Sequence, residues 1–148
     1  MTLVVRQATR HDWPALQQLF LLSRRHTFTW LDVVGFRLTD LDKQTEGETI
    51  WLAHDPQGEL AGFISVWMPE HFIHHLHVAC AHQGCGVGKM LLRALPGWQE
   101  HGYQLKCLTR NRNALAFYDT CGFVTIDEGI SDEGAYRLLK RMAAWPER

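Results

Sequence analysis

Residues 83–88 read Gln-Gly-Cys-Gly-Val-Gly, and their types and spacing suggest a binding site for phosphate. Glycines alternate at Gly84, Gly86 and Gly88, and Lys89 adds a positive charge directly after them. A predicted strand precedes the segment and a predicted helix follows it. The first N–H groups of a helix have no partner within the helix, and the helix dipole favours negative charge there. The segment is therefore predicted to hold a phosphate group.

Spacing separates the known phosphate-binding motifs. If Gly88 and Lys89 were the Gly-Lys pair of a Walker A loop, position 83 would be Gly and position 90 Ser or Thr, but the chain has Gln83 and Met90. A dinucleotide fingerprint that begins at Gly84 would need a glycine where Lys89 stands. Neither motif fits this chain.

A second motif lies at residues 111–123, with Asn111, Ala114 and Tyr118 followed by Gly122 and Phe123. With the pattern Gln-x-x-Gly-x-Gly at residues 83–88, it resembles the two signatures of the Gcn5-related N-acetyltransferase (GNAT) superfamily. The resemblance extends loosely over nearly the whole chain. It implies a single α/β domain over residues 1–148, the acyl-CoA N-acyltransferase fold. Its mixed sheet would be mostly antiparallel, with a parallel central pair and flanking helices.

The resemblance also implies a reaction, in which an acetyl group passes directly from acetyl-coenzyme A to a primary amine. The backbone of Leu76 and Val78 would pair with the pantetheine arm. The residues implied to hold the pyrophosphate are Gln83, Gly84, Cys85, Gly86, Val87, Gly88 and Lys89. Those implied to flank the pantetheine and the thioester are Asn111, Ala114, Phe117 and Tyr118. The Tyr118 hydroxyl would be the acid that protonates the leaving thiolate.

A general base is expected on residues 72–78, which carry three histidines. An alkylamine is mostly protonated at neutral pH, and an imidazole with a pKa of ~6.5 can accept its proton. Strand alternation predicts that His74 lies on the face opposite His75 and His77. In some members of the superfamily the base lies four or six residues before the position of Val78, which selects His74 because Phe72 cannot serve.

Other arrangements of these groups stay open. His75 is the second candidate base, and a water relayed by Glu48, Glu70 or a backbone carbonyl is the third. His75 and His77 share a predicted face, as two metal ligands would, but no third ligand is evident in the sequence. We therefore expect no metal.

The composition limits the class of protein. The chain has 148 residues, a net charge of −1 and scattered basic residues, which indicate one globular domain without a nucleic-acid footprint. Its four cysteines form no Cys-x-x-Cys pair, and no apolar run is long enough for a membrane span. We expect a cytoplasmic protein with reduced thiols that binds neither nucleic acid nor membrane. Homodimerisation is left open.

The elements that position these residues follow from periodicity and turn signals. Strands are predicted at 3–7, 49–54, 60–68, 72–78, 104–109, 123–127 and 135–142. Helices are predicted from a cap at Thr9 to about Arg25, and at 38–45, 88–100 and 111–121. Because Pro96 falls inside the helix after the glycine-rich segment, a kink or an end near Leu95 is expected there.

The acceptor is less determined by the sequence. Aromatic residues that could line its pocket are Phe28, Trp30, Phe36, Trp51 and Trp67. We expect a small amine or an amino-acid-like metabolite. The alternatives are a protein N-terminus or lysine and, in another functional class, a non-catalytic module that senses acyl-coenzyme A.

Overall fold

A seven-stranded mixed sheet organises the chain, with the strand order β1-β2-β3-β4-β5-β7-β6. The computed structural model describes residues 2–27 and 35–142. The strands are β1 Val4–Gln7, β2 Thr49–His54, β3 Leu60–Trp67, β4 Phe72–Val78, β5 Gln104–Leu108, β6 Phe123–Ser131 and β7 Gly134–Arg141. Only β4 and β5 pair in parallel, and the other pairs are antiparallel. The predicted fold class is confirmed.

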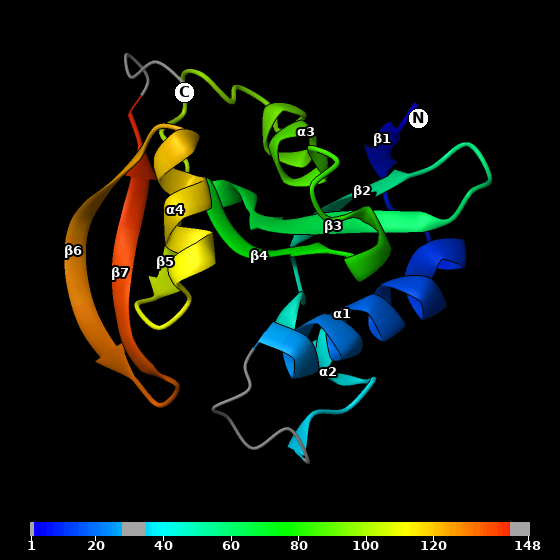
Figure 1. Cartoon of the computed structure of the whole chain (residues 1–148), viewed down its shortest axis with the longest axis horizontal. Coiled ribbons are helices and arrows are strands. Elements are labelled where there is room, and N and C mark those ends of the chain that lie inside the picture. The colour runs from blue at the N-terminus through cyan, green and yellow to red at the C-terminus, as the bar shows by residue number, and fades with distance from the viewer. Residues whose placement is uncertain (1, 28–34, 143–148) are drawn as a thin grey trace.

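Helices cover both faces of this sheet. They are α1 Trp13–Thr27, α2 Asp40–Gln44, α3 Val87–Arg93 and α4 Arg112–Thr120. Figure 1 shows α1 and α2 on one side of β2–β4 and α3 on the other, with α4 beside β5–β7. No helix in residues 2–27 and 35–142 has the length and apolar character needed to cross a membrane.

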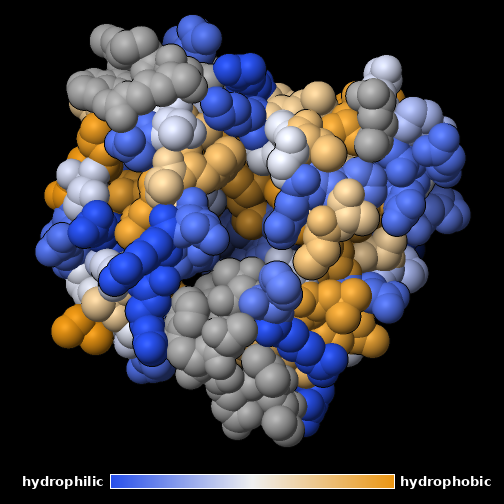
Figure 2. Space-filling model, viewed as in Figure 1, coloured by the Kyte–Doolittle hydropathy of each residue, from blue (hydrophilic) through white to orange (hydrophobic). Residues whose placement is uncertain are grey.

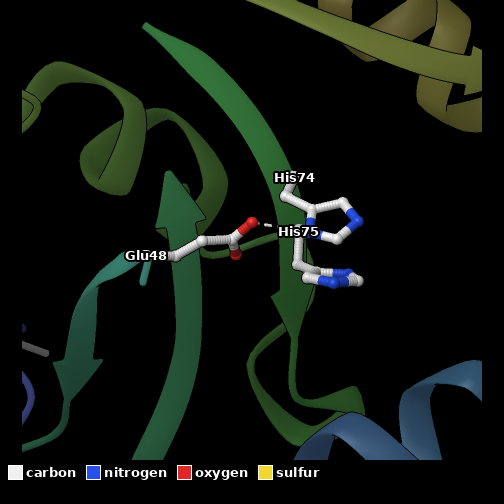
Figure 3. Close-up of side chains that lie close together, drawn as sticks. All are labelled: Glu48, His74 and His75. Carbon is white, nitrogen blue, oxygen red and sulfur yellow. Dashed lines mark hydrogen bonds and ion pairs between the residues drawn. The ribbon is translucent and has the colours of Figure 1, made fainter. Parts of the chain in front are cut away.

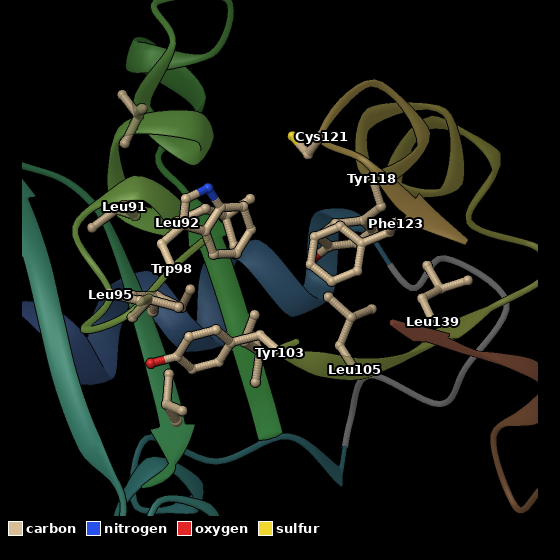
Figure 4. Close-up of a cluster of buried hydrophobic side chains, with 14 of the residues drawn as sticks. Leu91, Leu92, Leu95, Trp98, Tyr103, Leu105, Tyr118, Cys121, Phe123 and Leu139 are labelled. Carbon is tan, nitrogen blue, oxygen red and sulfur yellow. The ribbon is translucent and has the colours of Figure 1, made fainter. Parts of the chain in front are cut away.

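Two apolar clusters hold the layers together. The larger joins α3 and α4 to one face of the sheet, and Figure 4 shows its aromatic centre, where Trp98 and Tyr118 lie near Phe123. The smaller joins α1 and α2 to the opposite face through Leu16, Phe20 and four further buried side chains. Burial of these clusters fixes the two helix layers that flank β4.

The capped start of the first helix is confirmed, although its first turn is a 3-10 turn over Arg10–Asp12. The Asp12 carboxylate accepts hydrogen bonds from the Thr9 N–H at 2.7 Å and from the Thr9 hydroxyl at 3.0 Å. Arg6 of β1 donates to the same carboxylate. These contacts fix the beginning of the helix to the edge of the sheet.

The parallel pair opens shortly after it forms. Phe72 pairs with Gln104 and Ile73 with Leu105, and the register between β4 and β5 ends there. In Figure 1, β2–β4 run across the view whereas β5–β7 run up and down it. The β5-side edge of β4 is therefore free of strand pairing from His74 to Val78. This edge is where the sequence prediction places the pantetheine arm.

An irregularity in β4 corrects the prediction about its faces. Ser65 pairs with His75, but the next residue of β3, Val66, pairs with Ile73, so His74 is an extra residue in the ladder. A β-bulge of this kind breaks the alternation of side chains. The His74 and His75 ring centroids lie 4.0 Å apart. The prediction that these two histidines lie on opposite faces is wrong.

Two predicted boundaries change by more than two residues. The helix after the glycine-rich segment ends at Arg93 rather than Glu100, close to the end near Leu95 that Pro96 suggested. The Pro96 carbonyl instead accepts a hydrogen bond from the Tyr103 hydroxyl. Strand β6 runs four residues beyond its predicted end at 127, to Ser131, because it pairs with β7 along its whole length.

Phe20 is expected to be the main stabilising contact between α1 and the strand of histidines. Its ring is fully buried, at 4.8 Å from the His75 ring and 5.2 Å from the His77 ring. Phe20→Ala should lower the free energy of unfolding by about 3–5 kcal/mol, because it leaves a cavity in a packed core. Urea denaturation followed by circular dichroism measures this. Leu22→Ala on the same helix is the control, since Leu22 is 53% exposed. An equal loss in both variants would contradict the assignment.

Candidate functional site

The predicted phosphate-binding segment forms a turn that leads into α3. A short 3-10 helix, Cys80–His82, precedes it, and Gly86 is the N-cap of α3. Gly84 and Gly86 both have φ of 79°, a left-handed conformation that residues with a side chain rarely adopt. The N–H groups in the first turn of α3 have no acceptor within the helix. This backbone is suited to an anion.

The turn is fixed to the β2–β3 hairpin by a buried contact between a histidine and a carboxylate. His82 Nε2 lies 3.4 Å from Asp55 Oδ2, and both side chains are almost fully buried. Asp55 Oδ1 also accepts the N–H groups of Gln57 and Glu59 at 2.9 Å, as the predicted hairpin turn requires. Hydrogen bonds from this backbone, and then His82, lower the pKa of the Asp55 carboxyl. His82, which directly precedes the turn, therefore anchors it to the β2–β3 hairpin.

Gly88 marks a close approach between α3 and α4. A Cβ atom at this position would lie 2.8 Å from the end of the Phe117 ring, nearer than side chains pack. The two predicted motifs, distant in sequence, thus meet at Gly88 and Phe117. Figure 2 shows a hollow near the centre of the face, between the surfaces of α3 and α4.

The second motif forms α4 and its cap. Asn111 is the N-cap, and its Oδ1 accepts the N–H of Ala114 at 3.3 Å. Asn111 therefore has a structural role in starting α4. The Asn111, Ala114 and Phe117 side chains are partly buried. Their predicted contacts with the pantetheine stay predictions.

Tyr118 lies one residue beyond Phe117 and is 9% exposed. Its ring packs against the Phe117 and Phe123 rings, each with a centroid distance of 5.3 Å. Burial raises the pKa of the Tyr118 hydroxyl well above its usual value. The hydroxyl therefore keeps its proton at neutral pH and is available as a hydrogen-bond donor.

The edge of β4 that lacks a strand partner is the third part of this site, beside the turn that leads into α3 and helix α4. Leu76 and Val78 pack against the cluster beneath α3, as Ile73 does. Their backbone pairs with Ile64 and Gly62 of β3 on one side only. The groups that the sequence prediction assigns to the pantetheine thus have an open edge, while their contact with coenzyme A stays a prediction.

His74 forms a pair with a carboxylate that lies 26 residues away in sequence. His74 Nδ1 lies 2.7 Å from Glu48 Oε2, and Figure 3 shows the carboxylate directed at the two histidine rings. A carboxylate only accepts hydrogen bonds, so the proton is on Nδ1 and the lone pair of a neutral ring is on Nε2. His74 is 41% exposed, whereas the Glu48 side chain is only 9% exposed. An accessible imidazole is thus held by a buried carboxylate.

The other two histidines have different surroundings. His75 packs against Phe20, and burial followed by the charges of its neighbours holds its pKa well below the usual value. His77 Nδ1 hydrogen-bonds Ser23 Oγ at 2.7 Å, and burial lowers the pKa of His77 to about 3. Both side chains are therefore neutral and weakly basic at physiological pH. Neither is as well suited as His74 to accept a proton.

The residues around Glu48 include groups that the sequence prediction did not place together. Glu48, His74 and His75 each offer one possible ligand atom, and these atoms lie within 4.8 Å of one another. The sequence analysis had instead considered His75 and His77 as a possible pair of metal ligands. Glu48 also lines a pocket of about 440 Å³ together with Ala8, Thr9, Arg10, Trp13 and Ile50.

Three of the five aromatic residues predicted to line the acceptor pocket lie in the part of the chain that the structure describes, and these three are dispersed. Phe28 and Trp30 lie outside the described residues. Trp51 packs against the cluster beneath α3, while Phe36 lies against the Arg24 guanidinium. Trp67 is 39% exposed at the end of β3. These positions do not form one wall.

Comparison with known proteins supports the interpretation of both motifs. Residues 46–125, just over half of the chain, match the family model described as an acetyltransferase (GNAT) domain. The peptidyl-lysine N-acetyltransferase YiaC of Escherichia coli is 28% identical over 97% of each chain. The 5-NmdU N-acetyltransferase of Pseudomonas phage PaMx11 is 32% identical over 53% of this chain and 59% of the phage protein.

Solved structures share the fold at low sequence identity. The apo form of Escherichia coli YjaB superimposes with a TM-score of 0.77 at 18% identity, over 97% of this chain and all of YjaB. The PaiA N-acetyltransferase of Thermoplasma acidophilum, solved in complex with coenzyme A, gives a TM-score of 0.77 at 16% identity. That match covers 95% of this chain and 99% of PaiA.

Proposed function

Because the chain belongs to the GNAT acetyltransferase family, we propose that it transfers an acetyl group from acetyl-coenzyme A to a primary amine by direct attack. The family makes the chain an acetyltransferase. The proposal adds the donor site, the roles of individual side chains and the class of acceptor. The observation that carries it is the pairing of an accessible imidazole, His74, with the buried carboxylate of Glu48.

The donor would occupy the open edge of β4. The turn at residues 83–89 offers its backbone and Lys89 to the pyrophosphate. The edge from His74 to Val78 would offer N–H and C=O groups to the pantetheine amides, and α4 approaches α3 nearby, where Phe117 meets Gly88. PaiA, which shares the fold, was solved with coenzyme A, and this supports the same donor here.

Acetyl-coenzyme A supplies a thioester, whose carbonyl carbon is the centre attacked by the amine. His74 Nε2 accepts a proton from the acceptor nitrogen, and Glu48 stabilises the positive charge that develops on the ring. As the C–N bond forms and the C–S bond breaks, the Tyr118 hydroxyl donates to the sulfur. Both proton transfers, from the amine to His74 and from Tyr118 to the sulfur, then use side chains of this chain.

The proposed acceptor is a small primary alkylamine or an amino-acid-like metabolite. Its reacting nitrogen would approach His74, which is the most exposed of the three strand histidines. A second candidate is the lysine side chain of a protein. The similarity to YiaC, a peptidyl-lysine N-acetyltransferase, favours it. Both acceptors present the same alkylammonium group to His74.

A titration combined with an acceptor screen tests the proposal. Wild-type protein should bind acetyl-coenzyme A saturably, and Gly88→Val should weaken binding about tenfold or more, because its side chain would displace Phe117 from the contact between α3 and α4. Gly35→Val is the control, since its Cβ would meet no atom within 4 Å and, like Gly88, it does not have a positive φ.

The screen then measures thiol release with polyamines, amino acids and lysine peptides. Turnover of free amines supports the first acceptor class, and turnover of peptides alone supports the second. Equal affinity for acetyl-coenzyme A in wild type and Gly88→Val would contradict the proposed donor site. Absence of turnover with every amine would contradict the proposed reaction.

A further inference from the structure

Glu48, His74 and His75 form a cluster at the bulge of β4. Glu48 directly precedes β2, and the two histidines are adjacent residues on β4. One possible ligand atom from each lies within 4.8 Å of the other two. Figure 3 shows the Glu48 carboxylate directed at the two histidine rings, although Glu48 lies just before β2 and the histidines lie on β4.

Two atoms of this cluster are buried without a hydrogen-bond partner. They are Glu48 Oε1 and His75 Nε2. The Glu48 side chain is more than nine-tenths buried, at 9% exposure. Buried polar atoms are nearly always satisfied in folded proteins, so two unsatisfied atoms in one cluster indicate a missing partner that can interact with both.

The His75 ring is oriented as a ligand would be. A hydrogen bond joins the ring to the backbone of Gln44, and because Nε2 has no partner, this bond is made by Nδ1. The Nδ1–H group donates to a carbonyl oxygen, so Nε2 carries the lone pair. Metal-binding histidines commonly have a backbone carbonyl on their second nitrogen.

We propose that Glu48, His74 and His75 bind a zinc ion that inhibits the enzyme. Two imidazoles and a carboxylate are a ligand set that suits Zn²⁺, whereas Mg²⁺ and Ca²⁺ prefer oxygen ligands alone. Zinc bonds of about 2.0–2.2 Å place tetrahedral ligand atoms about 3.4 Å apart. This separation lies between the 2.7 Å from His74 Nδ1 to Glu48 Oε2 and the 4.8 Å limit of the cluster, so the side chains must adjust when the ion binds. His74 is the exposed member and can rotate.

Zinc at this position would take the place of the proton between His74 and Glu48. With Nδ1 on the metal, the neutral His74 ring carries its proton on Nε2 and cannot accept one from the amine. Zinc binding is independent of the proposed function. Only the inhibition depends on it, because only that step requires His74 to be the base.

Direct measurement of zinc binding tests the site without activity. Wild-type protein, freed of metal with a chelator, should take up one Zn²⁺ per chain in competition with a chromophoric chelator. Glu48→Gln and His75→Gln should each weaken this binding about tenfold or more. His101→Gln is the matched control and should bind zinc as the wild type does, since His101 stacks on His71, away from the cluster. Circular dichroism checks that each variant folds.

Cobalt distinguishes this cluster from the exposed thiols of Cys80 and Cys85. Co²⁺ bound by the cluster should give visible ligand-field bands without the near-ultraviolet charge-transfer band of a thiolate. Absence of zinc binding, unchanged affinity in Glu48→Gln, or a thiolate band would each overturn the site.

The inhibition is measured separately. Acetyl transfer should fall with the same dependence on free zinc as binding, and a chelator should restore it. Binding without inhibition would overturn the inhibitory role. Absence of acetyl transfer in metal-free buffer would instead contradict the proposed function, so the two failures are distinguishable.

Discussion

Tyr118→Phe is expected to lower kcat for acetyl transfer by about 10²–10³-fold, the usual effect of removing a general acid. The affinity for acetyl-coenzyme A should stay near its wild-type value, because the substitution removes one oxygen atom and leaves the ring. The measurement is steady-state release of free thiol at saturating amine, together with a binding titration.

The surroundings of Tyr118 explain the size of this effect. The ring is held between Phe117 and Phe123, and burial raises the pKa of the hydroxyl. A hydroxyl that keeps its proton can donate to the departing sulfur, where negative charge develops. In a site shielded from water, such a donor stabilises the charge more than it would in solvent.

Tyr103→Phe is the matched control for this experiment. Tyr103 is also a buried tyrosine, but its hydroxyl donates to the Pro96 carbonyl, beyond the C-terminal end of α3. Its loss should cost about 1 kcal/mol of stability and leave kcat unchanged. If Tyr118→Phe turned over like wild type, or if both variants lost activity equally, Tyr118 would not be the acid.

Local signals in the sequence were sufficient for most of the fold. Strand β2 has its predicted bounds, because the Asp55–Gly58 turn determines where the hairpin reverses. Helix α4 is within one residue of its prediction at each end, since Asn111 caps its start and Gly122 follows its end. Caps and turns depend on neighbouring residues, and this is why they are readable from sequence.

The bulge at His74 could not be read in the same way. The bulge depends on how β3 and β4 pair. No residue type in β4 signals a bulge in the way that a glycine signals a turn. Sequence alternation therefore separated His74 from His75, whereas the structure brings their rings together. The choice of His74 as the candidate base did not depend on alternation, so it stays a prediction, whereas the predicted position of its ring relative to His75 is wrong.

The position of Glu48 beside His74 could be predicted from the sequence only in part. It was considered from sequence only as a relay for water, with no reason to link it to His74. The predicted hairpin and the next strand would have indicated the neighbourhood, because Thr49 pairs with Val66, which pairs with Ile73. The side-chain contact itself needed three strands in register, which is long-range information.

His74→Ala is expected to lower kcat/KM by about 10²–10³-fold, with little change in the affinity for acetyl-coenzyme A. The base would be lost while the donor site at residues 83–89 stays intact. Imidazole added to the buffer should restore part of the activity, because the side chain removed is 41% exposed and its space is open to solvent. Thiol release in metal-free buffer, with and without imidazole, measures this.

Glu48→Gln and His75→Ala complete the test. Glu48→Gln should reduce kcat by about tenfold without rescue by imidazole, since it leaves the His74 ring in place but removes the carboxylate that orients it. His75→Ala should not respond to imidazole, because its ring is buried against Phe20 and weakly basic. Rescue of His75→Ala and not of His74→Ala would transfer the role of base to His75. In that case the proposed arrangement would be wrong, because it requires Glu48 to position an accessible His74 as the base while the buried His75 stays neutral.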